Sequence, residues 1–224
     1  MCFSATASFT AAGILSVMGI LTIKAARTKE LRLFASVPLF FAIQQFLEGI
    51  LWITLTRGHP DSFIHLMAMY GFLFFAGIFW PVWIPTVLYR LEEDAFRKKV
   101  IKGFLSIGIF IALFYLPVLL IIGSDVEMVG HHLAYPFPTD RFEYYTKNYG
   151  DPIYYFLLTL YVIDIVGACF TSSFPRMWIF GVSVGISLLI AYIFYALSVG
   201  SVWCYFSALI SGVIYFVVKK PKNA

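Results

Sequence analysis

The sequence predicts an all-α membrane protein, a bundle of seven transmembrane helices with its N-terminus outside and its C-terminus inside. Of the 224 residues, 61% are hydrophobic and only 12% are charged, and the mean hydropathy is +0.86. A soluble domain has about 25% charged residues, so this chain has too little polar surface to cover a water-soluble globule. The charges also separate apolar stretches of about 20 residues, the length that crosses a bilayer as a helix. Finally, basic residues gather on alternate connections between these stretches.

The apolar stretches divide the chain into seven expected spans. The first ends at Lys24 and the bases that follow it, and the second ends at the polar stretch RGHPD. The third contains two prolines in PVWIP, which should kink the helix or unwind its end. The uncharged segment from Met177 to Val218 is too long for one span, so it is expected to turn at SVGS, residues 198–201. The expected spans are 4–23, 33–55, 63–89, 103–123, 152–171, 177–197 and 202–218, within a single membrane domain, 1–224.

Basic residues set the orientation, because the cytoplasmic loops of membrane proteins carry an excess of Lys and Arg. Thirteen of the 16 basic residues fall on the side that holds the C-terminus. They are Lys24, Arg27, Lys29, Arg32, Arg90, Arg97, Lys98, Lys99, Lys102, Arg176, Lys219, Lys220 and Lys222. Only Arg57, Arg141 and Lys147 fall on the other side. The long loop 124–150, which contains GHHLAYPFPTDRFEYY, is therefore expected outside, where it would cap the outer mouth of the bundle.

One acid, Glu48, lies inside the second expected span, about 10 Å from its outer end. An ionised side chain at the bilayer centre costs roughly 2.5–3.5 kcal/mol, so this carboxyl should be paired, protonated or turned to a polar cavity. Gln44 and Trp52 lie four residues away on the same helix face, and Gln45 lies three residues away. We expect a polar stripe there. It has a functional explanation and a structural one, in which a neighbouring Tyr, Trp or backbone group pairs with Glu48.

The other acid inside a span is Asp164, near the middle of the fifth and toward the inner side. It is expected to be a separate feature. Functional and structural explanations are equally favoured here. In the structural one, a hydrogen bond from Tyr161, Tyr192 or Tyr195 satisfies the carboxyl.

Other rare groups belong to the same outer third as Glu48. Cys2 stands at the outer start of the first span and His65 at the outer start of the third. Trp203 and Cys204 stand at the outer start of the seventh. The topology therefore predicts that these residues approach Glu48, although they are far apart in the sequence. His131 and His132 lie in the outer loop, where a solvated position is favoured over a ligand role.

Three kinds of chemistry fit this set. Thiolate, imidazole and carboxylate are the usual ligands of zinc and later first-row metals. Cys2, Glu48, His65 and Cys204 are therefore candidate ligands of a transition metal, with zinc, copper and haem iron as the alternatives. The second possibility is a disulfide between Cys2 and Cys204, since the outer face is the oxidising side. The third is a proton or solute path through Gln44, Glu48 and His65.

Three stretches, MCFSATASF, QQFLEG and SVWCYF, carry a resemblance. With them the chain resembles a family of uncharacterised bacterial multi-pass membrane proteins of similar length. The resemblance implies a helical membrane fold in the inner (plasma) membrane and no established activity. It also directs attention to Cys2, Gln45, Glu48, Trp203 and Cys204. A microbial rhodopsin is disfavoured because residues 202–218 contain no Lys, and a ceramidase-like zinc protein because no His-x-x-x-His occurs.

The leading functional hypothesis is a buried polar site that opens to the outer face and binds a metal. It would carry out metal-dependent hydrolysis of a lipid or amphiphile. Its candidate residues are Glu48 as the catalytic group and a ligand, Cys2, His65 and Cys204 as further ligands, and Gln44, Gln45 and Trp203 around the cofactor.

The first alternative is a transporter or channel for a small solute or protons, which requires a polar path between Glu48 and Asp164. The second is a structural receptor or assembly factor. The expected partners are membrane lipid and a lipid or small-molecule ligand, and there is no nucleic-acid signature.

Overall fold

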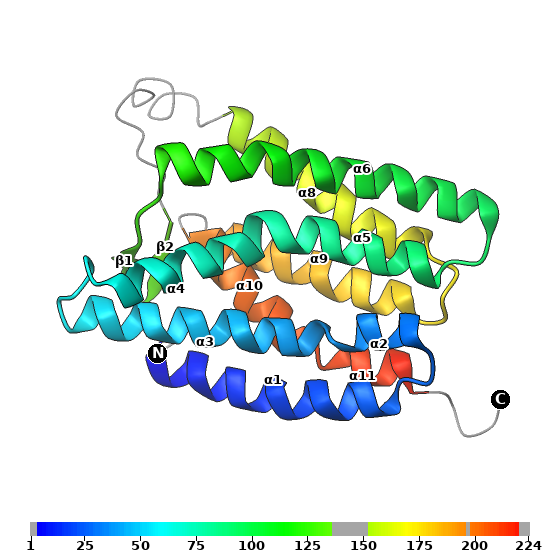
Figure 1. Cartoon of the computed structure of the whole chain (residues 1–224), viewed down its shortest axis with the longest axis horizontal. Helices are drawn as coiled ribbons and strands as arrows, with labels where there is room; N and C mark the ends of the chain where they lie inside the picture. Colours follow the sequence, from blue (N-terminus) through cyan, green and yellow to red (C-terminus); the bar gives the residue numbers. More distant parts are fainter. Residues whose placement is uncertain (1–3, 136–151, 196–197, 220–224) are drawn as a thin grey trace.

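Helices that run side by side along one long axis make up most of the molecule (Figure 1). The computed structural model describes residues 4–135, 152–195 and 198–219. The helices are α1 (Ala5–Ala25), α2 (Lys29–Ala35), α3 (Val37–Thr56), α4 (Phe63–Phe74), α5 (Trp80–Leu91), α6 (Ala95–Pro117), α8 (Pro152–Thr171), α9 (Met177–Phe194), α10 (Val199–Ile210) and α11 (Val213–Val218). Two π-helical turns, η1 (Phe75–Phe79) and η2 (Val118–Ile122), and two strands, β1 (Glu127–Val129) and β2 (His132–Ala134), complete the described elements.

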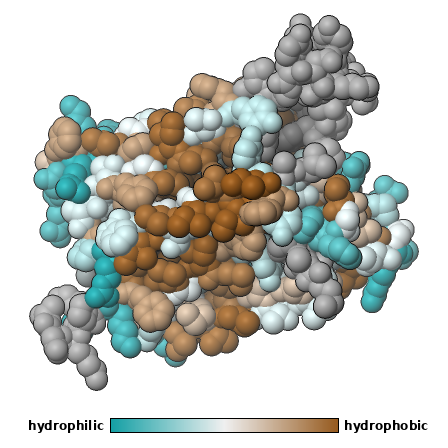
Figure 2. All heavy atoms as spheres, turned by 180° about the vertical axis from the view of Figure 1, so that it is seen from behind, coloured by the Kyte–Doolittle hydropathy of each residue, from teal (hydrophilic) through white to brown (hydrophobic). Residues whose placement is uncertain are grey.

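Within the described residues, six helical stretches are long and apolar enough to cross a membrane. They are Ala5–Ala25, Lys29–Thr56, Phe63–Leu91, Ala95–Ile121, Met177–Phe194 and Val199–Val218. The predicted fifth span corresponds to α8, and its apolar stretch Tyr155–Thr171 is shorter than these six. The surface agrees with this, because apolar side chains cover the middle of the molecule and hydrophilic ones gather toward both ends (Figure 2). The predicted helical class is confirmed, and the helices have the composition of a multi-pass membrane protein.

The expected boundaries differ from the structure at two helix breaks. The second span begins earlier than residue 33, and it is divided at Ser36, where α2 ends and α3 begins with a proline in its first turn. The predicted turn at residues 198–201 lies too late in the sequence, because α10 already begins at Val199. Ser201 therefore lies in the first turn of a helix rather than in a loop, which brings its side chain into the bundle.

The two prolines of PVWIP neither unwind the third span nor end it. Instead the π-helical turn η1 precedes Pro81, and the Trp80 N–H donates to the carbonyl of Phe75, five residues back. Proline has no N–H and its ring crowds the preceding turn, so a wider turn relieves the clash. This leaves the Ala76 carbonyl without its helical donor, and the hydroxyl of Tyr161 on α8 supplies one at 2.8 Å.

At the end of the bundle where α5 and α8 finish, Glu92 connects two loops. The carboxylate is 1% exposed and accepts hydrogen bonds from the Ser173 N–H and hydroxyl, both at 2.6 Å, and from the Asp94 N–H at 3.1 Å. Burial raises the pKa of Glu92, but the hydrogen bonds outweigh it, so the pKa lies below its ordinary value. Beside it, the Arg97 guanidinium donates to the last carbonyl of α8, that of Thr171.

At the opposite end, the chain departs from the all-α prediction. Part of the expected outer loop forms an antiparallel hairpin of β1 and β2, with Gly130 at φ +62° in its turn. Leu133 is fully buried against the bundle, and the ring of Tyr135 stacks on Phe72 of α4 with ring centroids 4.7 Å apart. The described part of the loop thus covers this end of the helices, and the remainder of 124–150 lies outside the described residues.

Candidate functional site

A chain of buried polar groups joins three helices around Gln44. Gln44 lies on α3 and is fully buried. Its side-chain nitrogen donates to the sulfur of Cys204 on α10 at 3.3 Å, and its oxygen accepts from the indole N–H of Trp80 on α5 at 2.8 Å. The indole can only donate, so it fixes which end of the amide faces α5. A buried amide held in this way connects α3, α5 and α10 at one depth.

One turn further along α3, Glu48 is the centre of a second polar group. It is 1% exposed. One carboxyl oxygen accepts from the hydroxyl of Ser201 on α10, and the other accepts from the Gln45 amide at 3.2 Å. No basic side chain pairs with this acid among the described residues. Two neutral donors therefore stabilise Glu48, and one of them belongs to the first turn of α10.

The hairpin adds a third group to this cluster. Among the described residues, the buried hydroxyl of Tyr135 has no hydrogen-bond partner, and neither has the side-chain oxygen of Gln45. Burial raises the pKa of Tyr135 well above its ordinary value, and charge on Glu48 or Cys204 acts in the same direction. Tyr135 is therefore within electrostatic range of both residues. Two unpaired polar atoms beside a buried carboxyl are a place where a water or a small polar ligand fits.

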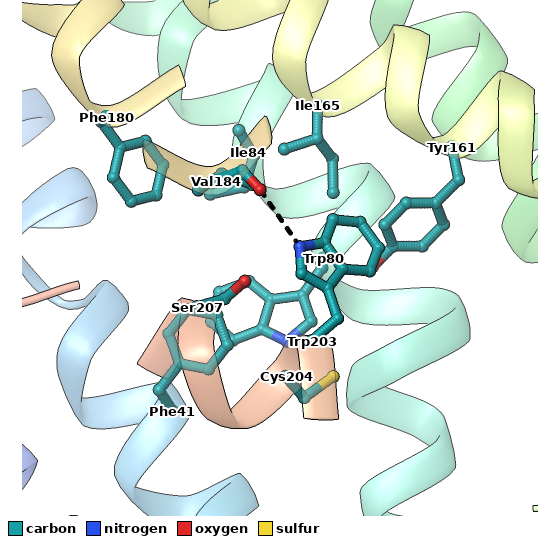
Figure 3. A pocket seen from close by; sticks show the side chains of 10 residues that line it. All are labelled: Phe41, Trp80, Ile84, Tyr161, Ile165, Phe180, Val184, Trp203, Cys204 and Ser207. Atoms are coloured by element: carbon teal, nitrogen blue, oxygen red, sulfur yellow. Dashed lines mark hydrogen bonds between the residues drawn. The ribbon is translucent and has the colours of Figure 1, made fainter. Parts of the chain in front are cut away.

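Next to the Gln44 group lies a cavity of about 30 Å³, enough for about two water molecules (Figure 3). Most of its lining is apolar. Among the lining residues, those with a polar group in the side chain are Trp80, Tyr161, Trp203, Cys204 and Ser207. Trp203 is held in place because its indole N–H donates to the Val184 carbonyl at 3.3 Å, and its ring meets Tyr161 edge to face. The cavity therefore has fixed aromatic walls on the α8 and α10 sides.

Asp164 lies on α8, next to residues that line this cavity. Its neighbour Ile165 and Tyr161, one turn earlier, line the cavity. Asp164 itself is fully buried, and neither of its carboxyl oxygens accepts a hydrogen bond from any described residue. The expected hydrogen bond from Tyr161 is not formed, because that hydroxyl donates to Ala76 instead. The carboxyl is thus an unpaired acid in the interior of the bundle.

The predicted metal ligands do not come together in the described part of the chain, where no group of three or more His, Cys, Asp or Glu side chains is placed to share an ion. His65 is buried at the start of α4, but its Nδ1 bonds the Thr54 hydroxyl at 2.7 Å, six residues beyond Glu48 on α3. Cys204 forms no disulfide with another described cysteine. Cys2 lies outside the described residues, so its part in a metal site or a disulfide stays a prediction.

Sequence reasoning missed three members of the site. Ser201 was assigned to a turn, Trp80 was one of many aromatic residues in an apolar span, and Tyr135 lay in a long loop. Proline in PVWIP was the only local signal near Trp80, and nothing in the local sequence marked Ser201 or Tyr135. Only tertiary contacts, such as the one between Glu48 and Ser201 across 153 positions, reveal them.

The whole chain, residues 1–224, matches the profile of a family of unknown function, DUF6629. The chain belongs to this family. Comparison with curated proteins and with solved structures found no significant match. Membership in DUF6629 agrees with the resemblance in the sequence, and it assigns no activity to Glu48, Gln44 or Asp164.

Proposed function

We propose that this protein is a seven-span membrane protein, N-terminus outside and C-terminus inside, that conducts protons across the inner (plasma) membrane. The asymmetry of basic residues supports the orientation. The opposite positions of the start of α1 and the end of α11 along the bundle support an odd number of spans (Figure 1). In this topology the hairpin faces outside, and the loop that contains Glu92 faces inside.

The observation that carries the proposal is the pair of buried acids, Glu48 and Asp164, each within about one helical turn of a residue that lines a water-sized cavity or bonds to its lining. Glu48 lies eight residues, about 12 Å, from the outer end of α3. Asp164 lies seven residues, about 10 Å, from the inner end of α8. Ionisable residues inside membrane helices are rare and commonly mark proton paths. One acid therefore lies in each half of the bundle.

The groups between the two acids suit proton movement. Gln44 and Cys204 link the turn next to Glu48 to the cavity, and Tyr161 lines the cavity one turn from Asp164. A water molecule in the cavity could both donate and accept a hydrogen bond, and it would lie between Cys204 and Tyr161. The same volume is too small for an acyl chain. This favours conduction of protons over hydrolysis of a lipid, which was the leading hypothesis from the sequence.

Proton flux into liposomes tests this function. Full-length protein is reconstituted with a pH-sensitive dye inside, and a potassium gradient with valinomycin drives proton entry. We expect flux above that of empty liposomes and a loss of at least tenfold in Glu48→Gln and in Asp164→Asn. Glu127→Gln in the exposed first strand of the hairpin removes an acid without touching the path and should conduct as the wild type does. The proposal is refuted if the protein that carries both Glu48→Gln and Asp164→Asn conducts as the wild type does, or if the wild type shows no flux.

A further inference from the structure

The second proline of PVWIP removes the helical donor of a carbonyl inside the bundle. In a regular helix the carbonyl of residue 81 accepts from the N–H of residue 85. Residue 85 is a proline within α5 and has no N–H, so the Pro81 carbonyl loses its helical donor. A buried carbonyl without a donor is unfavourable, above all in a membrane, where no bulk water replaces the missing bond. Some group on a neighbouring helix is expected to compensate it.

Gly108 of α6 contacts this carbonyl, and Asp164 of α8 lies close to Gly108. A Cβ added to Gly108 would overlap the Pro81 carbonyl oxygen, and it would lie 3.2 Å from the carboxyl oxygen Oδ2 of Asp164. The absence of a side chain at Gly108 therefore lets the backbone of α5 approach α6 closely, with the carboxyl of Asp164 at the same spot. Three helices contribute to one small polar site.

The neighbouring turn of the same helices shows how such a site is satisfied. Tyr161, one turn before Asp164 on α8, donates its hydroxyl to the Ala76 carbonyl that Pro81 deprives of a donor. Asp164 lies close to Gly108, the residue that contacts the carbonyl that Pro85 leaves without a helical donor. An ionised carboxylate has only acceptors to offer a carbonyl, whereas a neutral carboxylic acid has an O–H to donate. Protonation would satisfy both groups at once.

We propose that Asp164, the Pro81 carbonyl and Gly108 form a proton-binding site in which the neutral acid of Asp164 donates its hydrogen to that carbonyl. The site deepens the proposed function, since it names the group that holds the proton in the inner half of the bundle, but it does not require that protons cross the membrane. Loss of the proton leaves a carboxylate facing a carbonyl oxygen. This repulsion ties release of the proton to separation of α8 from α5.

In the part of the chain that the structure describes, no basic side chain bonds to the Asp164 carboxyl. Three helices, α5, α6 and α9, pack against α8. Their titratable and charged side chains, with those of α8 and the cavity, are Tyr89, Arg90, Arg97, Lys98, Lys99, Lys102, Tyr115, Tyr155, Tyr161, Cys169, Tyr192 and Cys204. The base nearest in sequence to Gly108 on α6 is Lys102, six residues or about 9 Å away along the axis. Asp164 is fully buried between these positions, which favours the neutral form.

Infrared spectroscopy of the full chain in lipid tests this site at neutral pH. A protonated carboxylic acid gives a C=O stretching band separate from the amide bands. Asp164 is the only aspartate within the expected spans, so protein grown with aspartate that carries ¹³C in its carboxyl should show this band shifted to lower frequency. The band should be lost in Asp164→Asn and retained in Glu48→Gln.

Asp164→Asn is also the variant least able to disturb the fold, because its amide N–H₂ still donates to the Pro81 carbonyl. A neutral-pH acid band that shifts with the label and disappears in Asp164→Asn supports the proposal even if no proton flux is measured. Absence of any band that responds to labelled aspartate means that Asp164 is ionised, and this overturns it. That result comes from unmutated protein, so a folding defect in the variant does not affect it.

Discussion

The close approach of α5 and α6 predicts that Gly108→Ala destabilises the protein. The added Cβ would lie 2.6 Å from the carbonyl carbon of Pro81 and closer still to its oxygen. An ordinary contact is 3.4–4 Å, so the two helices must separate by roughly 1 Å to accept the methyl group. Backbone cannot rotate away as a side chain does. Overpacking of this kind costs about 1–3 kcal/mol, and for a protein of this size the melting temperature should fall by about 2–12 °C.

Gly103→Ala provides the matched control on the same helix, because nothing lies within 4 Å of the added Cβ. Alanine is the better helix former by about 1 kcal/mol, so this variant should melt at or above the wild-type temperature. Both melting temperatures are measured in the same detergent by intrinsic fluorescence, with monodispersity checked beforehand. If Gly108→Ala melts as Gly103→Ala does, the close approach is wrong, and the geometry of the site around Asp164 is wrong with it.

Two further changes test contacts that hold the bundle together. Tyr161→Phe removes the donor to the Ala76 carbonyl and should lower the free energy of unfolding by about 1–3 kcal/mol, measured by denaturant titration in detergent; an unchanged value would mean that the carbonyl finds another donor. Glu92→Gln should cost about 1–3 kcal/mol at neutral pH, because the amide cannot accept from Ser173 and Asp94 as the carboxylate does. Since the pKa of Glu92 is lowered in the folded protein, its contribution is complete above its ordinary value of 4.5 and is lost as the pH falls through the folded value. The difference between wild type and variant should therefore shrink in acid, and a difference that grows would contradict the assigned hydrogen bonds.

The sequence predicted the fold and the face of α3 better than it predicted the partners of that face. Spacings of three and four residues place Gln44, Gln45 and Glu48 together on any helix, so this part of the site follows from local geometry. Ser201 and Trp80 belong to the same site through contacts between distant helices, which no local pattern encodes. Asp164 was recognised as unusual. It lacks the expected hydrogen bond because the hydroxyl of Tyr161 donates to the Ala76 carbonyl and not to the Asp164 carboxyl.

The prolines show why local rules were incomplete in another way. Pro81 was expected to kink the helix or unwind its end, and the structure shows that the helix is not unwound there. The structure uses a π-helical turn and a hydroxyl from α8 instead. The absence of an N–H on proline predicts that a carbonyl of the preceding turn loses its donor. Which group then donates to that carbonyl depends on the neighbouring helix. The hairpin escaped prediction for a related reason, since its buried residues Leu133 and Tyr135 depend on the bundle end that receives them.

The hydrogen bonds from α3 to α10 also bear on how the protein is made. Gln44 and Glu48 enter the membrane early in synthesis, whereas Cys204 and Ser201 follow 160 and 153 positions later. Until α10 arrives, the newly made helix α3 holds an amide and an acid that lack these partners in the lipid. An α3 made without α10 should therefore be less stable in the bilayer than the same helix in the complete bundle.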